Sequence, residues 1–352
     1  MDLKIFGWDA FFEKHFEPYA AKGYSAGRVS LEHRKRYRLY TSEGELWGDI
    51  RGKFFHTAES REDLPVVGDW VVIRMLPNEK KAVIHALLPR KSKFSRKVKG
   101  DRLEEQLVAA NIDTVFLVSG LDNEFNPRRI ERYLTLTSES GARAVIVLNK
   151  ADLCPDIDEK IKQADMVAQG NPVIVISALQ KDDLKKLDPF IKKGETIALL
   201  GSSGVGKSTI INQLLGEKVQ KVHDDVPNFR GLHVTTHRQL FLLPSGGLII
   251  DTPGMREIQL WVGEAGLEEA FEDITRLAEK CYFRDCQHQN EPGCAVREAL
   301  ESGELSYDRY QSYLKLKREI EETAWQLTVK KKPDKKKKKK SEQKESKYKN
   351  RW

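Results

Sequence analysis

The nine residues from Gly201 to Thr209, GSSGVGKST, constrain this chain more than any other segment. They fit the pattern G-x-x-x-x-G-K-[ST], in which glycines allow consecutive backbone N–H groups to surround phosphate oxygens. An apolar run that reads as a buried strand, Thr196 to Leu200, precedes them, and a helix opens after them. Because strand, loop and helix stand in the required order, a glycine-rich turn without a ligand is disfavoured. The expected phosphate-binding residues are Gly201, Ser202, Ser203, Gly204, Val205, Gly206, Lys207, Ser208 and Thr209.

Within this loop we expect Lys207 to place its charge on the outer phosphates and Ser208 to offer its hydroxyl to Mg²⁺. A second motif, Asp251-Thr252-Pro253-Gly254, also follows an apolar strand. The carboxylate of Asp251 can reach Mg²⁺ through water, and the N–H of Gly254 can meet a γ-phosphate. These residues therefore predict a nucleoside triphosphate with magnesium.

Asn149-Lys150-Ala151-Asp152 follows a further apolar strand and predicts the base. The carboxylate of Asp152 can accept two hydrogen bonds from the N1–H and the exocyclic amine of guanine. Adenine lacks that donor pair, so an unpaired buried charge would reject it. We expect Asn149 to brace the loop and the Lys150 stem to cover the ring.

Ser177-Ala178-Leu179, again at a strand end, suits a backbone N–H donated to the guanine carbonyl oxygen, with Ser177 and Ala178 as the expected contacts. A short polar quartet alone is weak evidence. Together with two phosphate-binding motifs at the carboxyl ends of strands it predicts GTP and GDP as ligands and disfavours an ATP-specific enzyme.

The order of these motifs is unusual, because the base-reading residues precede the phosphate loop. In ordinary small GTPases the phosphate loop comes first. We therefore expect a circular permutation, which can preserve a site when the original termini lie close together. The segment from Gln180 to Glu195 would bridge those termini.

The rest of the chain predicts a multidomain protein in which a β-barrel precedes the α/β region and a helical region follows it. Residues 22–92 contain five short alternating runs punctuated by Gly and Pro, which suits an OB-fold barrel. Basic residues lie in one of these runs beside Tyr37 and Tyr40, and predict either a nucleic-acid surface or an ordinary solvated hairpin. A basic linker follows, and strands then alternate with helices as in a parallel sheet covered on both faces.

Four ligand-type residues stand in the helical region with the spacing Cys-x4-Cys-x-His-x5-Cys: Cys281, Cys286, His288 and Cys294. Three thiolates and one imidazole make a closed tetrahedral site for a structural Zn²⁺. The fourth cysteine, Cys154, stands apart and is expected to be a lone thiol. Few cysteines and no export segment predict a cytoplasmic protein, and no apolar stretch is long enough to span a membrane.

The formal net charge of +7 is concentrated in the last residues of the chain. Residues 330–352 hold 12 Lys and 1 Arg against 3 acidic residues, a net of +10, so the remainder carries −3. A tail of this composition is expected to be disordered and to favour polyanions. A merely solubilising appendage is the alternative.

The motifs and their permuted order resemble the ribosome-small-subunit-dependent GTPases of the RsgA (YjeQ) family over nearly the whole chain. The resemblance implies an extension (1–21), an OB-fold barrel (22–92), a circularly permuted GTPase domain (93–259), a helical zinc-binding domain (260–329) and the tail (330–352). It also implies binding to the small ribosomal subunit and its rRNA, with a role in late subunit maturation. We expect a monomer without membrane contact.

The resemblance further implies a switch segment, here Gly231-Leu232-His233-Val234-Thr235-Thr236-His237. Val234 departs from the family pattern, so Thr235 and Thr236 are both candidates for the contact to Mg²⁺ and the γ-phosphate. Met255 stands where many GTPases carry a water-positioning Gln. A thioether cannot orient water, so we expect slow intrinsic turnover and a partner, or His237, to complete the site. The alternatives are a GTP-regulated binder of another RNA and a scaffold that binds GTP without hydrolysing it.

Overall fold

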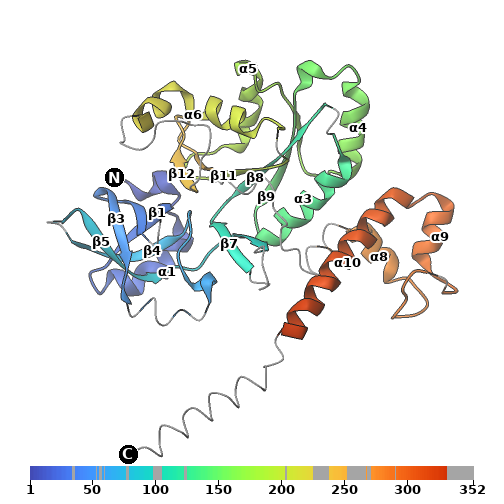
Figure 1. Ribbon diagram of the computed structural model, residues 1–352, viewed down its shortest axis with the longest axis horizontal. Coiled ribbons are helices and arrows are strands. Elements are labelled where there is room, and N and C mark those ends of the chain that lie inside the picture. The colour runs from blue at the N-terminus through green and yellow to red at the C-terminus, as the bar shows by residue number, and fades with distance from the viewer. Residues whose placement is uncertain are drawn as a thin grey trace, which may run out of the picture.

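The computed structural model describes all residues except 34–35, 53, 55–57, 59, 77–78, 98–104, 123–124, 203, 225–237, 252–266, 268–270, 290 and 331–352. The described part forms a β-barrel, an α/β region and a helical region, in that order along the chain (Figure 1). The Lys-rich tail beyond residue 330 lies outside the described residues. Among the described helices, none combines the length and apolar composition needed to cross a membrane.

Five strands close the barrel in the order β1-β2-β3-β5-β4, with β4 pairing back onto β1. Alternate residues of these strands, including Val29, Leu39 and Ile73, fill the interior. The expected OB-fold barrel is thereby confirmed. The strands are β1 (Ser25–His33), β2 (Arg36–Thr41), β3 (Gly44–Ile50), β4 (Trp70–Leu76) and β5 (Lys81–Leu87).

An ordered N-terminal segment packs against this barrel. It contains the 3-10 helix η1 (Leu3–Phe6) and α1 (Ala10–Ala20), which begins where the Asp9 carboxylate accepts hydrogen bonds from the N–H groups of Phe11 and Phe12. The ring of Phe6 stacks on Tyr40 with centroids 4.4 Å apart, and Trp8 meets Trp70 edge-on at 4.8 Å. Aromatic packing therefore fixes the extension to the barrel wall.

The expected basic linker is partly a β-hairpin. Strand β6 (Lys93–Lys97) pairs antiparallel with β7 (Glu105–Ala110), because Phe94 and Leu107 bury apolar side chains between the charged ones.

Arg90 forms an ion pair with Asp69 at 2.7 Å, and the Asp69 side chain is fully buried. Burial raises the pKa of Asp69, and the hydrogen bond from Arg90 opposes that rise.

The α/β region is a six-stranded sheet in the order β10-β9-β8-β11-β13-β12, parallel except for β12. Its strands are β8 (Thr114–Gly120), β9 (Arg143–Asn149), β10 (Val173–Val175), β11 (Thr196–Leu200), β12 (Gln239–Leu242) and β13 (Leu248–Asp251). The helices are α3 (Pro127–Ser140), α4 (Ile157–Val167), α5 (Lys181–Leu184) and α6 (Lys207–Asp224).

Helices cover both faces of this sheet, as the fully apolar strands predict. On β8, Val115 and Leu117 face the cluster that contains residues of α3 and α4. The intervening Phe116 and Val118 face the cluster that contains residues of α5 and α6. The short helices around α5, including η5 (Lys185–Phe190), occupy the segment expected to join the original termini.

The barrel and the α/β sheet are continuous, because β1 pairs antiparallel with β12 through Leu31 and Gln239. Arg28 on β1 lies in the same junction with only 2% of its surface exposed. Its guanidinium donates to the carbonyls of Phe6, Gly68 (3.2 Å) and Asn111 (3.0 Å) and to the Thr196 hydroxyl (2.8 Å). One buried cation therefore ties together the N-terminal segment, the barrel and the strand that leads into the phosphate loop.

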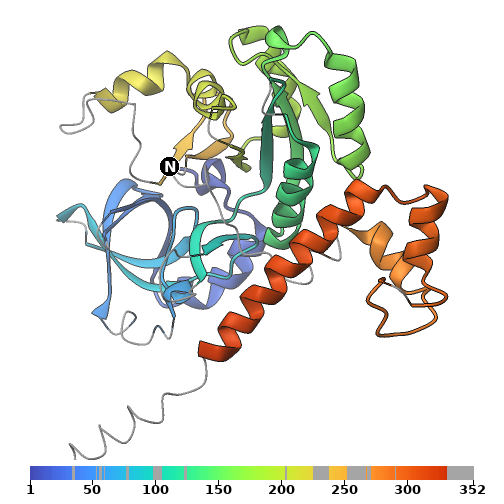
Figure 2. The same ribbon diagram turned by 45° about the vertical axis from the view of Figure 1, so that its right-hand side comes forward.

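The helical region contains α8 (Glu272–Ala278), α9 (Ala295–Ser302) and α10 (Tyr307–Lys330). Residues 264–266 and 268–270, which precede α8, lie outside the described part. Helix α10 runs past α3 (Figure 2). Arg309 at its start binds Glu131 of α3 at 2.6 Å and Asp273 of α8 at 2.5 Å, which fixes this region to the α/β region.

Candidate nucleotide-binding site and metal centre

The motif-bearing residues lie together because the strands that precede them are parallel neighbours. Strands β9, β8, β11 and β13 run in one direction, so their carboxyl ends form a single edge of the sheet. Asn149 ends β9, the phosphate loop follows β11 and Asp251 ends β13. Ligands of open α/β sheets bind at such an edge.

Two positions of the phosphate loop require glycine, because neighbouring atoms lie too close for a side chain. A Cβ on Gly201 would lie 2.2 Å from the carbonyl oxygen of Val118, and one on Gly206 would lie 2.2 Å from Nδ2 of Asn149. Gly206 also has a φ of +99°, in the region that favours glycine. The loop therefore packs directly against β8 and against the end of β9.

Asn149 connects three segments that are far apart in the sequence. Its side chain is 2% exposed, its Nδ2 donates to the Val205 carbonyl at 2.8 Å, and its Oδ1 accepts from the Ala178 N–H at 2.8 Å. The base-reading motif, the Ser177-Ala178-Leu179 loop and the phosphate loop are thus joined through one amide. This contact assembles the site despite its permuted order.

The Ala178 N–H donates to Asn149, and the Ser177 N–H donates to the Asp183 carboxylate at 2.8 Å. The expected backbone contact from this loop to guanine stays a prediction. The hydroxyl of Ser177 is buried and makes no hydrogen bond within the described part of the chain. These amides fix the position of the loop, and Leu179 follows with its side chain 75% exposed.

Lys150 and Asp152 follow β9 at the edge of the sheet that also carries the phosphate loop. The backbone of Lys150 is left-handed, with a φ of +67°, and turns the chain into the 3-10 helix η4 (Ala151–Leu153), where the Asp152 side chain is exposed. Nζ of Lys150 binds the Asp122 carboxylate at 2.5 Å. Asp122, the second residue after β8 at the same sheet edge, was not predicted from the sequence, although its position after a buried strand could have identified it.

Lys207 begins α6 and is 7% exposed. Its Nζ donates to the carbonyl oxygens of Gly201 (2.6 Å) and Ser202. The Ser202 hydroxyl accepts a further bond from Nη1 of Arg129 at 2.5 Å. Arg129, in the first turn of α3, is a second cation at the phosphate loop that the motif did not predict.

Ser208 is exposed in the first turn of α6, and Asp251 is half-buried at the end of β13 beside β11. A hydroxyl and a carboxylate are ligands suited to Mg²⁺. The other expected residues of this site, Ser203, Thr235, Thr236, His237, Gly254 and Met255, lie outside the described residues.

The four ligand-type residues of the helical region form a compact cluster. One ligand atom from each of Cys281, Cys286, His288 and Cys294 lies within 4.8 Å of every other. Nδ1 of His288 is 3.4 Å from Sγ of Cys294 and 3.6 Å from Sγ of Cys281. The cluster can therefore hold a metal ion between the end of α8 and the start of α9.

Burial lowers the pKa of His288, which keeps its imidazole neutral and available to a metal. Burial and the neighbouring thiols of Cys294 and Cys281 raise the pKa of Cys286 to about 11. Cys154 is half-buried and belongs to no metal cluster found among the described residues, in agreement with its expected role as a lone thiol.

The barrel surface differs from the expectation based on its tyrosines. Tyr37 and Tyr40 are buried, 2% and 9% exposed, and Tyr40 donates to the Leu240 carbonyl at 3.1 Å. The guanidinium groups of Arg36 and Arg38 lie over Trp47, 5.2 and 5.4 Å from its ring centroid. Trp47, on the strand beside them, is the half-buried aromatic of this basic surface.

Several known proteins are similar to this chain in sequence and in fold. A family model for the RsgA GTPase matches residues 87–261. A protein from Opitutus terrae called small ribosomal subunit biogenesis GTPase RsgA is 46% identical over 330 residues, which cover 91% of this chain and 90% of that protein. The crystal structure of YjeQ from Thermotoga maritima has a TM-score of 0.63 at 29% identity and covers 84% of this chain and 98% of that one.

YloQ, a circularly permuted GTPase, has a TM-score of 0.62 at 25% identity, over 85% of this chain and 96% of its own. The permuted order inferred from the motifs, the barrel and the assembled nucleotide site agree with these similarities. On the identity and coverage of its relatives, the chain belongs to the RsgA GTPase family.

Proposed function

We propose that this protein hydrolyses GTP during the biogenesis of the small ribosomal subunit, and that hydrolysis times its release from the subunit. The O. terrae relative is named for that process, and its alignment covers 91% of this chain. The structural observation that carries the nucleotide part is the bridging position of Asn149, which joins both base-site loops to the phosphate loop. In this proposal the protein acts in the cytoplasm as a monomer.

The proposed nucleotide contacts follow from the geometry of the sheet edge. The Asp152 carboxylate accepts hydrogen bonds from guanine, Lys150 covers the ring, and the Ser177-Ala178-Leu179 loop closes the base pocket. Lys207 exchanges its two carbonyl partners for the outer phosphate oxygens, because a phosphate is the stronger acceptor for an ammonium group. The glycine-rich backbone surrounds the remaining phosphate oxygens.

Bound Mg²⁺ would neutralise charge on the outer phosphates, and Ser208 and Asp251 are the residues proposed to hold it. Thr235 or Thr236 and the N–H of Gly254 would close on the γ-phosphate from the switch segments. Since Met255 cannot position water, we propose that His237 or a group of the ribosomal subunit does so. Turnover without the subunit is therefore expected to be slow.

We propose that the cluster of Cys281, Cys286, His288 and Cys294 holds one structural Zn²⁺. A closed set of four protein ligands leaves no position for substrate, so the ion would stabilise the turn between α8 and α9. The Tyr310 hydroxyl donates to the His288 carbonyl at 3.3 Å and connects this turn to α10. The barrel and the zinc-bearing region would then contact rRNA from both sides of the GTPase domain.

The decisive test compares GTP turnover by the purified full chain alone, with purified small ribosomal subunits and with free rRNA at equal nucleotide concentration. Subunits should raise kcat at least tenfold, and free rRNA should raise it less. Lys207→Ala, which removes the phosphate-binding charge, should abolish turnover in every condition. Equal turnover with and without subunits would contradict the proposed function.

A further inference from the structure

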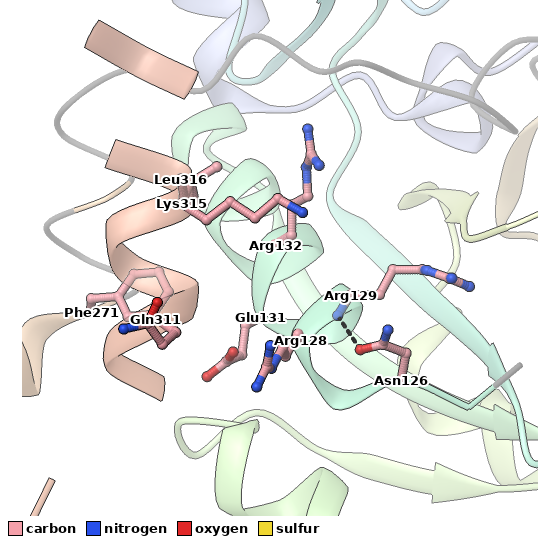
Figure 3. A pocket seen from close by; sticks show the side chains of 9 residues that line it. All are labelled: Asn126, Arg128, Arg129, Glu131, Arg132, Phe271, Gln311, Lys315 and Leu316. Carbon is pink, nitrogen blue, oxygen red and sulfur yellow. Dashed lines mark hydrogen bonds between the residues drawn. The ribbon is translucent and has the colours of Figure 1, made fainter. Parts of the chain in front are cut away.

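A cleft of about 370 Å³ separates α3 of the GTPase domain from α10 of the helical region. Phe271 lines it, as does Glu131, which binds Arg309. Among the described residues that line it, four are cationic, three from α3 and one from α10: Arg128, Arg129, Arg132 and Lys315. Figure 3 shows Lys315 extending from α10 toward Arg132, and Arg129 directed away from α10.

The charge of this cleft is opposite to that of the chain outside its tail. The chain apart from residues 330–352 carries a net charge of −3, yet the described residues that line the cleft include four cations and one carboxylate. That carboxylate, on Glu131, is 3% exposed and already accepts the 2.6 Å bond from Arg309. The described residues that line the cleft therefore carry a net positive charge, which favours an anionic ligand.

Arg129 belongs to two sites at once. It lines the cleft, and its Nη1 donates to the Ser202 hydroxyl of the phosphate loop at 2.5 Å. The backbone carbonyl of the same serine accepts from Lys207. Ser202 thus joins Arg129 on α3 to the cation of the nucleotide site, so a ligand of the cleft that shifts the first turn of α3 would alter the hydrogen bonding of the phosphate loop.

We propose that this cleft, which we call the α3–α10 cleft, binds the phosphodiester backbone of RNA and that Arg129 couples its occupancy to GTP hydrolysis. The inference rests on the proposed function for its physiological RNA and adds where that RNA contacts the chain and how it is sensed. Arg129 acts as a positioning residue through Ser202.

Several features favour RNA over an acidic protein segment. Three of the four cations are arginines, whose planar forks match phosphate oxygens bidentately. Arg128 and Arg132 are one helical turn apart, ~6 Å along α3, so adjacent phosphates could be held in series. The amides of Asn126 and Gln311 beside them can bind sugar hydroxyls and base edges.

The first experiment measures binding of a fluorescein-labelled single-stranded RNA 12-mer by anisotropy over a range of salt concentrations. The test variant is Arg128→Gln/Arg132→Gln/Lys315→Gln. The matched control is Lys162→Gln/Lys181→Gln/Lys192→Gln, which removes the same charge from exposed sites on α4 and around α5. The test variant should bind at least tenfold more weakly, with the salt slope smaller by about 2, since each lost phosphate contact on a single strand changes it by about 0.7.

An equal loss of RNA affinity in both triple variants would show that only net charge determines binding, and would overturn the proposal. Competition with a polyglutamate peptide at equal charge and ionic strength distinguishes the two anion classes. Displacement of the RNA by the peptide at the same concentration as unlabelled RNA would also overturn it.

The second experiment tests the coupling through Arg129. Arg129→Gln, assayed at saturating GTP, should reduce the increase in kcat caused by small subunits at least tenfold, whereas Arg129→Lys should keep part of that increase. A variant that is merely misfolded would also lose the cooperative urea unfolding transition of the wild-type chain. Unchanged stimulation in Arg129→Gln would refute the coupling.

The two proposals fail in different ways. If subunits stimulate the wild-type chain and the test triple variant equally, the cleft proposal is wrong and the proposed function stands. If subunits stimulate no variant but the 12-mer still distinguishes the test triple variant from its control, the proposed function is wrong and the cleft remains an RNA site.

Discussion

The guanidinium of Arg28 donates a hydrogen bond to the hydroxyl of Thr196 at 2.8 Å, across 168 positions of the sequence. Burial lowers the pKa of Arg28 to about 10, so the group is still charged at neutral pH. A buried charge is tolerated because its donors are satisfied by three carbonyls and this hydroxyl. The barrel is therefore joined to β11, the strand before the phosphate loop, by hydrogen bonds. An apolar side chain at position 28 could not make these bonds.

Arg28→Met should destabilise the junction, because it leaves several buried acceptors without donors. The expected loss in unfolding free energy is about 3 kcal/mol, measured by urea denaturation of the full chain. Lys22→Met removes an exposed cation just before β1 and should change stability by less than about 0.5 kcal/mol. Similar stabilities for both variants would contradict the role assigned to Arg28.

Gly206→Ala should abolish nucleotide binding without unfolding the barrel. The new methyl group would meet Asn149 at 2.2 Å on a backbone with a φ of +99°, so the phosphate loop must move away from β9. We expect at least a hundredfold weaker binding of a fluorescent GTP analogue. Gly52→Ala is the matched control, because a Cβ there would meet no atom of the described residues within 4 Å, and this variant should bind the analogue normally.

Asp152→Asn should change the base that is recognised. The substitution removes one acceptor for the guanine donors and supplies an N–H that can pair with the 2-carbonyl of xanthine. GTP affinity should fall at least a hundredfold while XTP affinity rises, measured by competition against the same fluorescent analogue. Retained preference for GTP over both ATP and XTP would show that another group reads the base.

Cys294→Ser should release the metal and loosen the helical region. Wild-type protein should contain one zinc per chain by elemental analysis, and the variant less than about 0.2. Cys154→Ser, which removes the cysteine outside the cluster, should retain full zinc content. A Cys294→Ser protein with undiminished zinc would exclude the four-residue site.

Alkaline pH should destabilise the barrel through Tyr37 and Tyr40. Burial raises the pKa of both phenols above the ordinary value of 10, so the unfolded chain releases these protons first. Their contribution to stability is fully present below pH 10 and falls by about 1.4 kcal/mol per pH unit and per tyrosine above it. Tyr37→Phe should roughly halve this slope in denaturation measured between pH 9.5 and 11.5.

Much of the nucleotide site could be predicted because it depends on short motifs at strand ends. The apolar runs identified β8, β9, β11 and β13, and parallel pairing then placed Asn149 beside the phosphate loop. Arg129 escaped prediction because it belongs to no pattern along the chain, and Asp122 because its position after a buried strand was its only signal in the sequence. Each reaches the site only through the fold, from a loop and a helix that begin at the same sheet edge.

The barrel shows where composition misleads. Tyr37 stood among basic residues and suggested an RNA-facing aromatic, yet it points inward on β2 as the strand alternation requires. Tyr40 is covered by Phe6, from a segment whose helix the sequence did not reveal. The basic linker was not predicted to contain strands, because its many charges outnumber the apolar residues. Two of these apolar residues, Phe94 and Leu107, are buried where β6 pairs with β7.

The pairing of Leu31 with Gln239 has a consequence for dissecting this protein. Strand β12 would otherwise be the outermost strand of the α/β sheet, with unpaired backbone groups available to other chains. A fragment beginning at residue 93 would expose this strand edge and the surface around Thr196 that Arg28 contacts in the full chain. The barrel thus shields the α/β region from self-association. A fragment without the barrel should precipitate or oligomerise.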